Sequence, residues 1–499
     1  MKNQVQLIAY VDRLAGAGFR ELQQLLDGPL QGLFGGVHLL PFFWPFDGAD
    51  AGFDPIDHTR VDPRLGTWED VRALADRAVV IADLIVNHIS RRSLQFEDFD
   101  NRGDQSPYAG MFLTFGRVFP NGAAESDLLK IYRPRPALPF TKLRLKNGTE
   151  RLLWTTFTPD QIDIDVRDRA SGEYLDQILD QFQAAGIRAI RLDAAGYAIK
   201  KPGTTCFMIP ETFDFISELT EQAHARGIEV LVEIHSYYLE QIAIAKQVDW
   251  VYDFALPPLV LHALYTGSSR RLKRWLEISP RNAVTVLDTH DGIGVIDVGP
   301  DRHNPAGRPG LLSSEEVDGL VESMHERSAG ASRQATGTAA SNLDLYQINC
   351  TYYDALARRD NEYLLARAIQ FFAPGVPQIY YVGLLAGTND LDLLRRSGVG
   401  RDINRHYYAR AELDERLKAP VVRALLDLIH FRNAHPAFAG EFHVRASDER
   451  SIALEWTKLP AWARLDVDLA ARCATISCSD PAGDRKIIIA PGALAEVDP

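Results

Sequence analysis

The stretch AIRLDAAGY, from Ala189 to Tyr197, places Arg191 and Asp193 at the end of an apolar run. The run has the length and β-branched character of a buried strand. A carboxylate at the end of such a strand is costly unless it is hydrogen-bonded or hydrated. We therefore expect this stretch to lie at the rim of a core, where charged side chains can serve a function.

Seven further apolar runs of this kind occur in the chain, and they begin at Val5, Gly36, Val79, Ile228, Val248, Ala283 and Pro374. Helix-like segments that close with a glycine lie between them, for example at 172–186 and 210–227. Alternating strands and helices are typical of a parallel sheet with crossover helices. Eight strands spaced by about 30 residues predict an α/β fold, a (β/α)8 TIM barrel.

Two intervals between strand starts are far too long for a single helix, those after the third and the seventh strand. Both connections leave from the carboxyl ends of strands, so we expect both insertions to cover one pocket. After about Phe438 the pattern changes to alternating runs that predict a small C-terminal all-β domain. The predicted units are a barrel of residues 1–86, 168–293 and 358–438, insertions at 87–167 and 294–357, and a β domain at 439–499.

The composition of the 499 residues is that of an ordinary soluble protein, with a formal net charge of −13. That charge opposes binding to nucleic acid or to an anionic membrane surface. No signal peptide pattern begins the chain and no run of about 18 apolar residues could span a membrane. The four cysteines lack zinc-site spacing and fit reduced thiols. We expect a cytoplasmic protein, and the sequence leaves a homodimer open.

Polar residues cluster at the ends of four predicted strands: Asp83, Asn87 and His88; Arg191 and Asp193; Glu233 and His235; and His290 and Asp291. Several converging carboxylates at one end of a barrel favour a function over simple capping. The histidines form no HxH or HExxH pair, so we expect no essential metal. A GxSxG elbow, a Walker loop and a GxGxxG turn after a strand are also missing from the sequence.

Carboxylate chemistry is the remaining interpretation. Cleavage of a glycosidic bond with retention needs an ionised nucleophile and a protonated acid about 5 to 5.5 Å apart. Arg191 is placed to keep Asp193 ionised, because a nearby cation favours the charged form of a carboxyl. Glu233 ends an apolar strand, where partial desolvation favours the protonated acid.

Four segments resemble the signature segments of the α-amylase superfamily, in the same order: ADLIVNH (82–88), IRLDAAGY (190–197), VEIHSYY (232–238) and LDTHDGIGV (287–295). Five more are similar to those of the phosphorylases in this superfamily that act on sucrose: residues 41–59, 131–141, 252–264, 339–349 and 400–408. The resemblance covers roughly residues 1 to 438.

The resemblance implies that Asp193 is the nucleophile, Glu233 the general acid and then base, and Asp291 the stabiliser of the transition state. It implies a set of residues around the glucosyl ring: Asp50, Phe53, His88, Phe157, Arg191, His290 and Arg401. It also implies a set that meets phosphate or fructose: Arg135, His235, Asp344, Leu345, Tyr346 and Gln347.

The small residues before Tyr197 are expected to let this ring turn back toward the sugar. Asn87 occupies a position that is often associated with calcium in amylases, but the phosphorylases resembled here need no metal and no cofactor. An arginine such as Arg135 suits an anionic acceptor, because a guanidinium binds phosphate through two parallel hydrogen bonds.

The substrates that follow from the resemblance are sucrose and inorganic phosphate, converted reversibly into α-D-glucose 1-phosphate and fructose. Alternatives within the fold are a phosphorylase of sucrose phosphate, glucosylglycerol or glucosylglycerate, and an α-glucosidase that uses water. A catalytically silent sugar-binding or transporter-associated protein is the alternative from another class. It is disfavoured because Asp193, Glu233 and Asp291 are all present.

Overall fold

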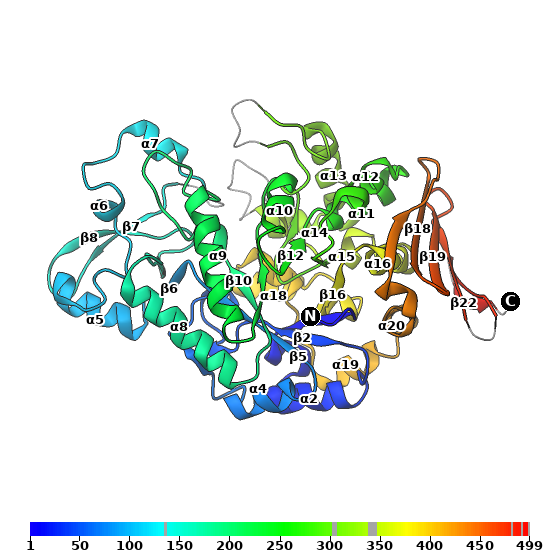
Figure 1. Ribbon diagram of the computed structural model, residues 1–499, viewed down its shortest axis with the longest axis horizontal. Coiled ribbons are helices and arrows are strands. Elements are labelled where there is room, and N and C mark those ends of the chain that lie inside the picture. The colour runs from blue at the N-terminus through cyan, green and yellow to red at the C-terminus, as the bar shows by residue number, and fades with distance from the viewer. Residues whose placement is uncertain (134–136, 302–306, 338–346, 481–482, 491–492, 498–499) are drawn as a thin grey trace.

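The core of the chain is a closed barrel of eight parallel strands, seen in a computed structural model (Figure 1) that describes residues 1–133, 137–301, 307–337, 347–480, 483–490 and 493–497. In chain order the barrel strands are β1 (Gln6–Ala9), β2 (Gly36–Leu39), β5 (Val79–Ile85), β10 (Ala189–Asp193), β11 (Glu229–Val232), β12 (Trp250–Asp253), β13 (Ala283–Thr285) and β16 (Val376–Tyr380). Each strand is parallel to both of its neighbours. The eight predicted strands and the predicted TIM barrel are therefore confirmed.

Helices cover the outside of the barrel because their apolar stripes pack on strands that are buried on both faces. The longer ones are α2 (Phe19–Asp27), α4 (Trp68–Ala75), α8 (Arg169–Ala184), α9 (Pro210–His224), α10 (Tyr238–Ile244), α11 (Leu256–Thr266), α12 (Arg270–Ile278), α16 (Asp360–Phe372) and α20 (Pro420–Ala434). In α8 the buried residues Tyr174, Ile178 and Phe182 recur at helical spacing. Asp168 caps this helix by accepting a hydrogen bond from the backbone N–H of Ala170, at 3.0 Å.

The first insertion follows β5 and lies on the left of Figure 1. Its elements are β6 (His88–Ser90), α5 (Leu94–Arg102), α6 (Phe115–Val118), α7 (Glu125–Lys130), β7 (Phe140–Arg144), β8 (Glu150–Trp154) and β9 (Gln161–Asp163). Strand β9 returns antiparallel to β6 and pairs Asp163 with His88. The insertion thus ends where it began, at the rim of the barrel.

The second insertion follows β13 and contains β14 (Ile293–Gly294), α13 (Ser314–Arg327), α14 (Ala331–Gly337) and β15 (Gln347–Ile348). Strands β14 and β15 are antiparallel, and their register sets Gly294 opposite Gln347. Both insertions thus leave from the third and seventh barrel strands, as predicted, while the numerical domain boundaries given above stay predictions.

The C-terminal sheet is antiparallel and lies at the far end of the molecule from the first insertion (Figure 1). Its strands are β17 (Glu441–Val444), β18 (Ser451–Lys458), β19 (Ala461–Asp468), β20 (Cys473–Cys478), β21 (Arg485–Ala490) and β22 (Ala493–Val497). Alternate residues such as Leu454 and Leu465 are buried in the same core as the barrel helices. Trp456 adds a hydrogen bond from its Nε1 to the carbonyl oxygen of Phe372 at the end of α16, at 2.8 Å.

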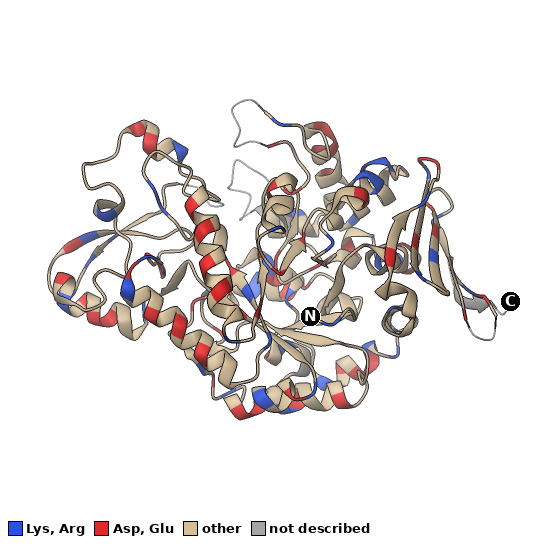
Figure 2. Cartoon of the chain, viewed as in Figure 1, with Lys and Arg blue, Asp and Glu red and all other residues tan. Residues whose placement is uncertain are grey.

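Acidic and basic side chains are interspersed along the outer helices, with stretches that are acidic alone (Figure 2). Helix α9 carries four acidic residues and no lysine or arginine. In the described parts of the chain, the helices are all too short or too polar to cross a bilayer.

One buried carboxylate joins the barrel, the second insertion and the C-terminal sheet. The side chain of Glu362 on α16 is 1% exposed and binds three guanidiniums. Arg359 contributes NH1 at 2.7 Å, Arg327 at the end of α13 contributes NH1 at 3.2 Å, and Arg472 between β19 and β20 contributes NH1 at 2.6 Å. Because a buried carboxylate needs such partners, this cluster fixes how the three units dock.

We expect Glu362→Gln to lower the free energy of unfolding by about 2 kcal/mol, the scale of a lost charge-assisted hydrogen bond. Glu441→Gln is the matched control, because the Glu441 side chain is 83% exposed and should change stability by less than about 0.5 kcal/mol. Urea denaturation of both variants measures the difference. Equal stability of the two variants would contradict the role of Glu362.

Candidate active site

The guanidinium of Arg191 lies at the centre of the barrel's carboxyl end and binds three carboxylates. The parallel register of β5 and β10 sets Arg191 beside Asp83, and its NH1 donates to Asp83 Oδ1 at 2.6 Å. The same NH1 donates to Asp193 Oδ1 at 3.1 Å, while NH2 lies 3.1 Å from Glu233 Oε1. The Arg191 side chain is 2% exposed, so these contacts are shielded from water.

Asp193 and Glu233 thus face each other across one guanidinium at the ends of neighbouring strands. Glu233 Oε2 also accepts a hydrogen bond from the backbone N–H of Ala194, at 3.4 Å. Burial raises the pKa of the Asp193 carboxyl well above its ordinary value; Arg191 opposes this shift, and Glu233 adds to it. Arg191 thus lowers the pKa of Asp193, as expected, but burial and the second carboxyl outweigh its effect and favour a proton in this pair.

Asp291, the third predicted carboxylate, follows β13 and lies against two arginines. Arg401 NH1 is 2.8 Å from Asp291 Oδ1, and Arg405 NH2 is 3.8 Å from the same oxygen. Burial opposes ionisation of Asp291, but the guanidiniums of Arg401 and Arg405 outweigh it and hold the pKa of this carboxyl well below its usual range. Asp291 therefore carries a negative charge beside the Asp193–Glu233 pair.

Asp50 shares the two arginines with Asp291. Its carboxylate accepts from Arg401 NH1 at 3.1 Å and from Arg405 NH2 at 3.2 Å. We expected the pair of Asp50 and Arg401 but did not predict Arg405. This residue is fully buried and also donates to the carbonyl oxygen of His290 at 2.9 Å. Its position four residues after Arg401 was the available signal.

Asp50 and Phe53 come from a strained loop between β3 (Phe43–Trp44) and β4 (Asp57–Val61). Asp50 and Ala51 have positive φ angles of 49° and 56°, a conformation that is uncommon outside glycine and occurs where other contacts enforce it. At Gly52, with φ 92°, a Cβ would meet the carbonyl oxygen of Phe46 at 2.5 Å, so only glycine fits. The loop presents Phe53 stacked on His290, with ring centroids 4.9 Å apart.

His88 is held by the first insertion. Its Nε2 lies 2.9 Å from the carbonyl oxygen of Phe53 and 3.0 Å from Gln161 Nε2, and its ring meets Phe157 edge-on at 5.4 Å. Gln161 on β9 is 2% exposed and gave no signal in the sequence, because nothing in its local pattern separates it from a structural glutamine. Burial lowers the pKa of both His88 and His290, to about 3 for His290, so these rings are neutral.

Tyr197 lies in an aromatic wall beside these residues. Its ring contacts Phe157 at 5.4 Å, Phe207 at 4.6 Å and Tyr132 at 6.2 Å. A Cβ on Gly196 would come within 2.7 Å of the Phe207 ring, so a small residue is needed there, as expected. Tyr132 and Phe207 were not predicted, since aromatic residues in a sequence are more often core than site.

Gln347 on β15 connects His235, which lies beside Glu233, with Arg401, which lies beside Asp291. Its Nε2 lies 3.1 Å from His235 Nε2, and its Oε1 accepts from Arg401 NH2 at 3.3 Å. The remaining predicted acceptor residues, Arg135, Asp344, Leu345 and Tyr346, lie outside the described residues.

Among the described residues, one group of side chains has the spacing of a metal site, and a second group of polar atoms lies near Asn87. Ligand atoms of Glu233, His235 and Asp291 come within 4.8 Å of one another, but each side chain already contacts a polar or charged protein group, including Arg191 on Glu233 and Arg401 on Asp291. The second group surrounds the position that is associated with calcium in amylases.

There the Asn87 Oδ1 lies 2.6 Å from the ammonium of Lys200, and Asp163 Oδ2 also lies at 2.6 Å. The carbonyl oxygen of Tyr197 accepts a third hydrogen bond from the same ammonium. The Lys200 side chain is 1% exposed. Since this ammonium already holds the cation position among the oxygens, the residues do not fit a bound calcium ion.

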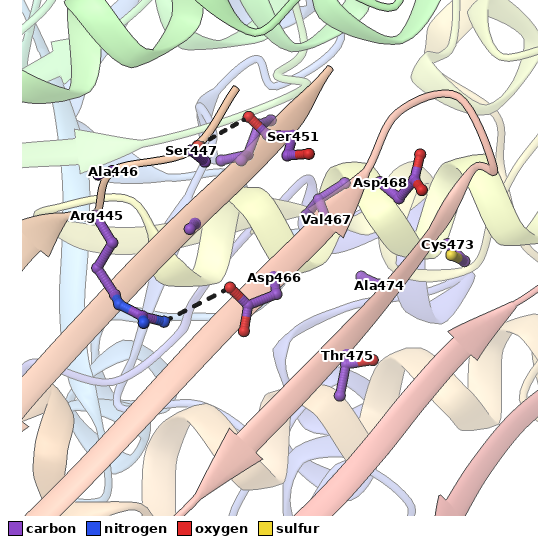
Figure 3. Close-up of a pocket in the computed structure, with 12 residues that line it drawn as sticks. Arg445, Ala446, Ser447, Ser451, Asp466, Val467, Asp468, Cys473, Ala474 and Thr475 are labelled. Carbon is purple, nitrogen blue, oxygen red and sulfur yellow. Dashed lines mark hydrogen bonds and ion pairs between the residues drawn. The ribbon is translucent and has the colours of Figure 1, made fainter. Parts of the chain in front are cut away.

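A pocket of about 320 Å³ lies away from these carboxylates, on the C-terminal sheet (Figure 3). It is crossed by the pair of Arg445 NH1 and Asp466 Oδ1 at 3.6 Å and has no aromatic residue in its lining. Such a surface lacks the stacking face that sugars use, so the barrel rim is the candidate site.

A closed parallel barrel with Asp193, Glu233 and Asp291 after its fourth, fifth and seventh strands is the arrangement typical of the α-amylase superfamily. The family described as "Alpha amylase, catalytic domain" matches residues 31–259. A sucrose phosphorylase of Agrobacterium vitis is 63% identical over 479 residues, 96% of this chain and 98% of the relative. A sucrose phosphorylase of Bifidobacterium adolescentis is 53% identical, over 97% of this chain and 98% of the relative.

Among solved structures, the sucrose 6F-phosphate phosphorylase of Thermoanaerobacter thermosaccharolyticum superimposes with a TM-score of 0.89. It is 38% identical, and the match covers 99% of this chain and 98% of the other. The chain belongs to the sucrose phosphorylase family of the α-amylase superfamily.

We expect Lys200→Met to lower the free energy of unfolding by about 3 to 5 kcal/mol, because it leaves the fully buried Asp163 carboxylate without its cation. Lys201→Met is the matched control: this neighbouring side chain is 53% exposed and should change stability by less than about 0.5 kcal/mol. Urea denaturation compares the two. Similar losses in both variants would contradict the buried cation.

Proposed function

We propose that this protein catalyses the reversible phosphorolysis of sucrose, giving α-D-glucose 1-phosphate and fructose with net retention. The observation that carries the proposal is the shared guanidinium: Asp193 and Glu233 each lie 3.1 Å from a different terminal nitrogen of Arg191. Two carboxyls so close suit the separation of about 5 to 5.5 Å used by retaining glycosidases. The identity to sucrose phosphorylases over nearly the whole chain supports the substrate.

In the first half of the reaction, Glu233 donates its proton to the glycosidic oxygen of sucrose. Asp193 attacks the anomeric carbon, the bond to fructose breaks, and a covalent β-glucosyl ester forms on Asp193. This step needs the proton on Glu233 and a charge on Asp193, so sucrose binding must leave Asp193 ionised although burial raises its pKa. Arg191 supports that distribution because it contacts both carboxylates.

In the second half, an oxygen of phosphate attacks the same carbon and the ester bond to Asp193 breaks. Glu233, now a carboxylate, takes the proton of the attacking phosphate oxygen and is restored as the acid. Positive charge develops on the sugar ring in both transition states, and the ionised Asp291 is placed to stabilise it.

The glucosyl pocket is closed on its far side by Asp50, Arg401 and Arg405. These groups are joined by ion pairs at 3.1 to 3.2 Å. Phe53, stacked on His290, offers an aromatic face to the sugar. A pocket built in this way takes one glucose unit, which matches the glucosyl half of sucrose.

A phosphorylase of a related α-glucoside is the second candidate. The 0.89 TM-score to the sucrose 6F-phosphate phosphorylase favours it as an alternative, but that relative is 38% identical whereas the two sucrose phosphorylases are 63% and 53% identical. The three carboxylates and their arginines disfavour a silent binding protein. A hydrolase would use the same carboxylates, and it is disfavoured by the identity to sucrose phosphorylases over nearly the whole chain.

We also propose that the protein acts in the cytoplasm. The four cysteines Cys206, Cys350, Cys473 and Cys478 are free thiols, which suits a reducing compartment. The net charge of −13 continues to predict no nucleic-acid partner.

Incubation with sucrose and phosphate should yield glucose 1-phosphate and fructose in equal amounts. Asp193→Ala should lower this turnover by at least about 10⁴-fold, because no ester can form. The control is Asp414→Ala, a half-exposed helix residue paired with Arg410. Glucose release that does not depend on phosphate would contradict the phosphorylase, and turnover retained by Asp193→Ala would show that the nucleophile is misassigned.

The raised pKa of Asp193 predicts the acid limb of the pH profile. Only the ionised carboxylate attacks, so kcat/KM for sucrose should fall as pH drops through this pKa, at a pH above the ordinary carboxyl value of about 4. The profile is measured with initial rates after brief exposure to each pH, with a return to neutral pH as the control for unfolding. Full kcat/KM down to pH 4 would show that Asp193 titrates normally.

A further inference from the structure

His235 is held from three directions next to the proposed acid–base residue. Its Nδ1 lies 3.0 Å from Asp297 Oδ2, and its ring stacks on Phe254 with centroids 3.8 Å apart. Its Nε2 lies 3.1 Å from the side-chain amide of Gln347 and 4.0 Å from Glu233 Oε1. The ring therefore has a fixed orientation, with Nε2 turned toward the site.

Asp297 belongs to no barrel strand and touches no catalytic carboxylate, yet it is fully buried. Its Oδ1 accepts from the backbone N–H of Ser236 at 3.2 Å and from Gln241 Nε2 on α10 at 2.8 Å. A Cβ on Gly294 would come within 2.3 Å of Oδ2, so the glycine leaves room for the contact with His235. The residues around the loop after β14 therefore hold the Asp297 carboxylate in one position.

A buried carboxylate needs a cation, and the partner of Asp297 that can become one is His235. Burial opposes the charge on His235, but Asp297 by charge and hydrogen bond, followed by Glu233 and Asp291 by charge, raises the pKa of this imidazole. The amide of Gln347 can rotate to accept from a protonated Nε2 as well as donate to a bare one. These groups favour the imidazolium.

The acceptor faces an electrostatic obstacle that this imidazolium relieves. Phosphate must approach the carboxylate of Glu233 with Asp193 and Asp291 close behind. Arg191 already forms ion pairs with three carboxylates, and Arg401 already forms ion pairs with Asp50 and Asp291. A further positive charge beside Glu233 lowers the cost of bringing an anion there.

We propose that Asp297 is a positioning residue for acceptor choice: it keeps His235 in the charged form, so that Nε2–H faces the acceptor and favours phosphate over water. This inference rests on the proposed phosphorolysis. The proton of His235 is not transferred; it stays on the ring while Glu233 takes the proton of phosphate and the ester bond to Asp193 breaks. Water, which is neutral, gains little from this charge.

Asp297→Asn tests the inference, because the amide can keep its oxygen on Ser236 and Gln241 while its NH2 faces Nδ1 of His235. The neutral ring that results still carries a hydrogen on Nε2, so the variant removes charge rather than shape. We expect the KM for phosphate to rise at least about tenfold at neutral pH, as expected when one nearby charge is lost. Fluoride release from α-glucosyl fluoride in water alone should stay within about threefold of the parent.

The pH dependence gives a readout that a structural role would not move. In the parent, the KM for phosphate stays low until pH rises through the raised pKa of His235; in Asp297→Asn it should begin to rise at a lower pH. The ionisation of phosphate is common to both proteins and cancels in the comparison. Asp318→Asn on α13, an exposed position in the same insertion, is the control and should match the parent.

An unchanged phosphate KM in Asp297→Asn overturns the proposal, and so does an equal loss of phosphorolysis and of fluoride release, which marks a structural role. A parent that does not use phosphate refutes the proposed function itself, which is a separate result. If the variant does not fold, NMR of the parent labelled with ¹⁵N-histidine decides, with the signal assigned by His235→Asn. Titration of His235 below the ordinary value of about 6.5 overturns the inference.

Discussion

The guanidinium of Arg191 is bound at once by Asp83, Asp193 and Glu233, and this sharing organises the whole catalytic rim. One positive charge cannot neutralise three buried carboxylates, so the protein alone favours keeping a proton among them. That residual proton is what a retaining reaction needs on its general acid. Burial of three carboxylates around one guanidinium costs folding free energy, and the same arrangement provides the proton and the nucleophile of the reaction.

The barrel supplies this rim, and the insertions complete it. The register of β5 and β10 sets Asp83 next to Arg191, which is a property of the barrel alone. The first insertion returns through β9 to hold His88 by way of Gln161, and the second returns through β15 to bring Gln347 against Arg401. Glu362 links the second insertion to the C-terminal sheet, so the insertion that brings Gln347 to the site is also anchored away from it.

The sequence predicts those parts of the molecule whose apolar runs repeat at a regular spacing or whose motifs follow a known order. The eight strands repeat with a visible spacing, and each carboxylate of the rim closes one of them. Arg405, Gln161, Tyr132 and Phe207 could not be found in this way, because their roles depend on contacts between segments that are distant in the chain. The effect of Arg191 on Asp193 could be predicted because a nearby cation is visible in a sequence, whereas burial beside a second carboxyl is not.

The two sides of the pocket solve opposite electrostatic problems. On the glucosyl side, Arg401 and Arg405 meet the charges of Asp50 and Asp291, which leaves a closed and compensated surface for a neutral sugar. On the acceptor side, an anion must come close to the same carboxylates that stabilise positive charge on the sugar ring. A histidine whose charge is maintained by Asp297 adds positive charge beside Glu233, and this charge helps the pocket to receive an anionic acceptor close to the carboxylates that stabilise a cationic transition state.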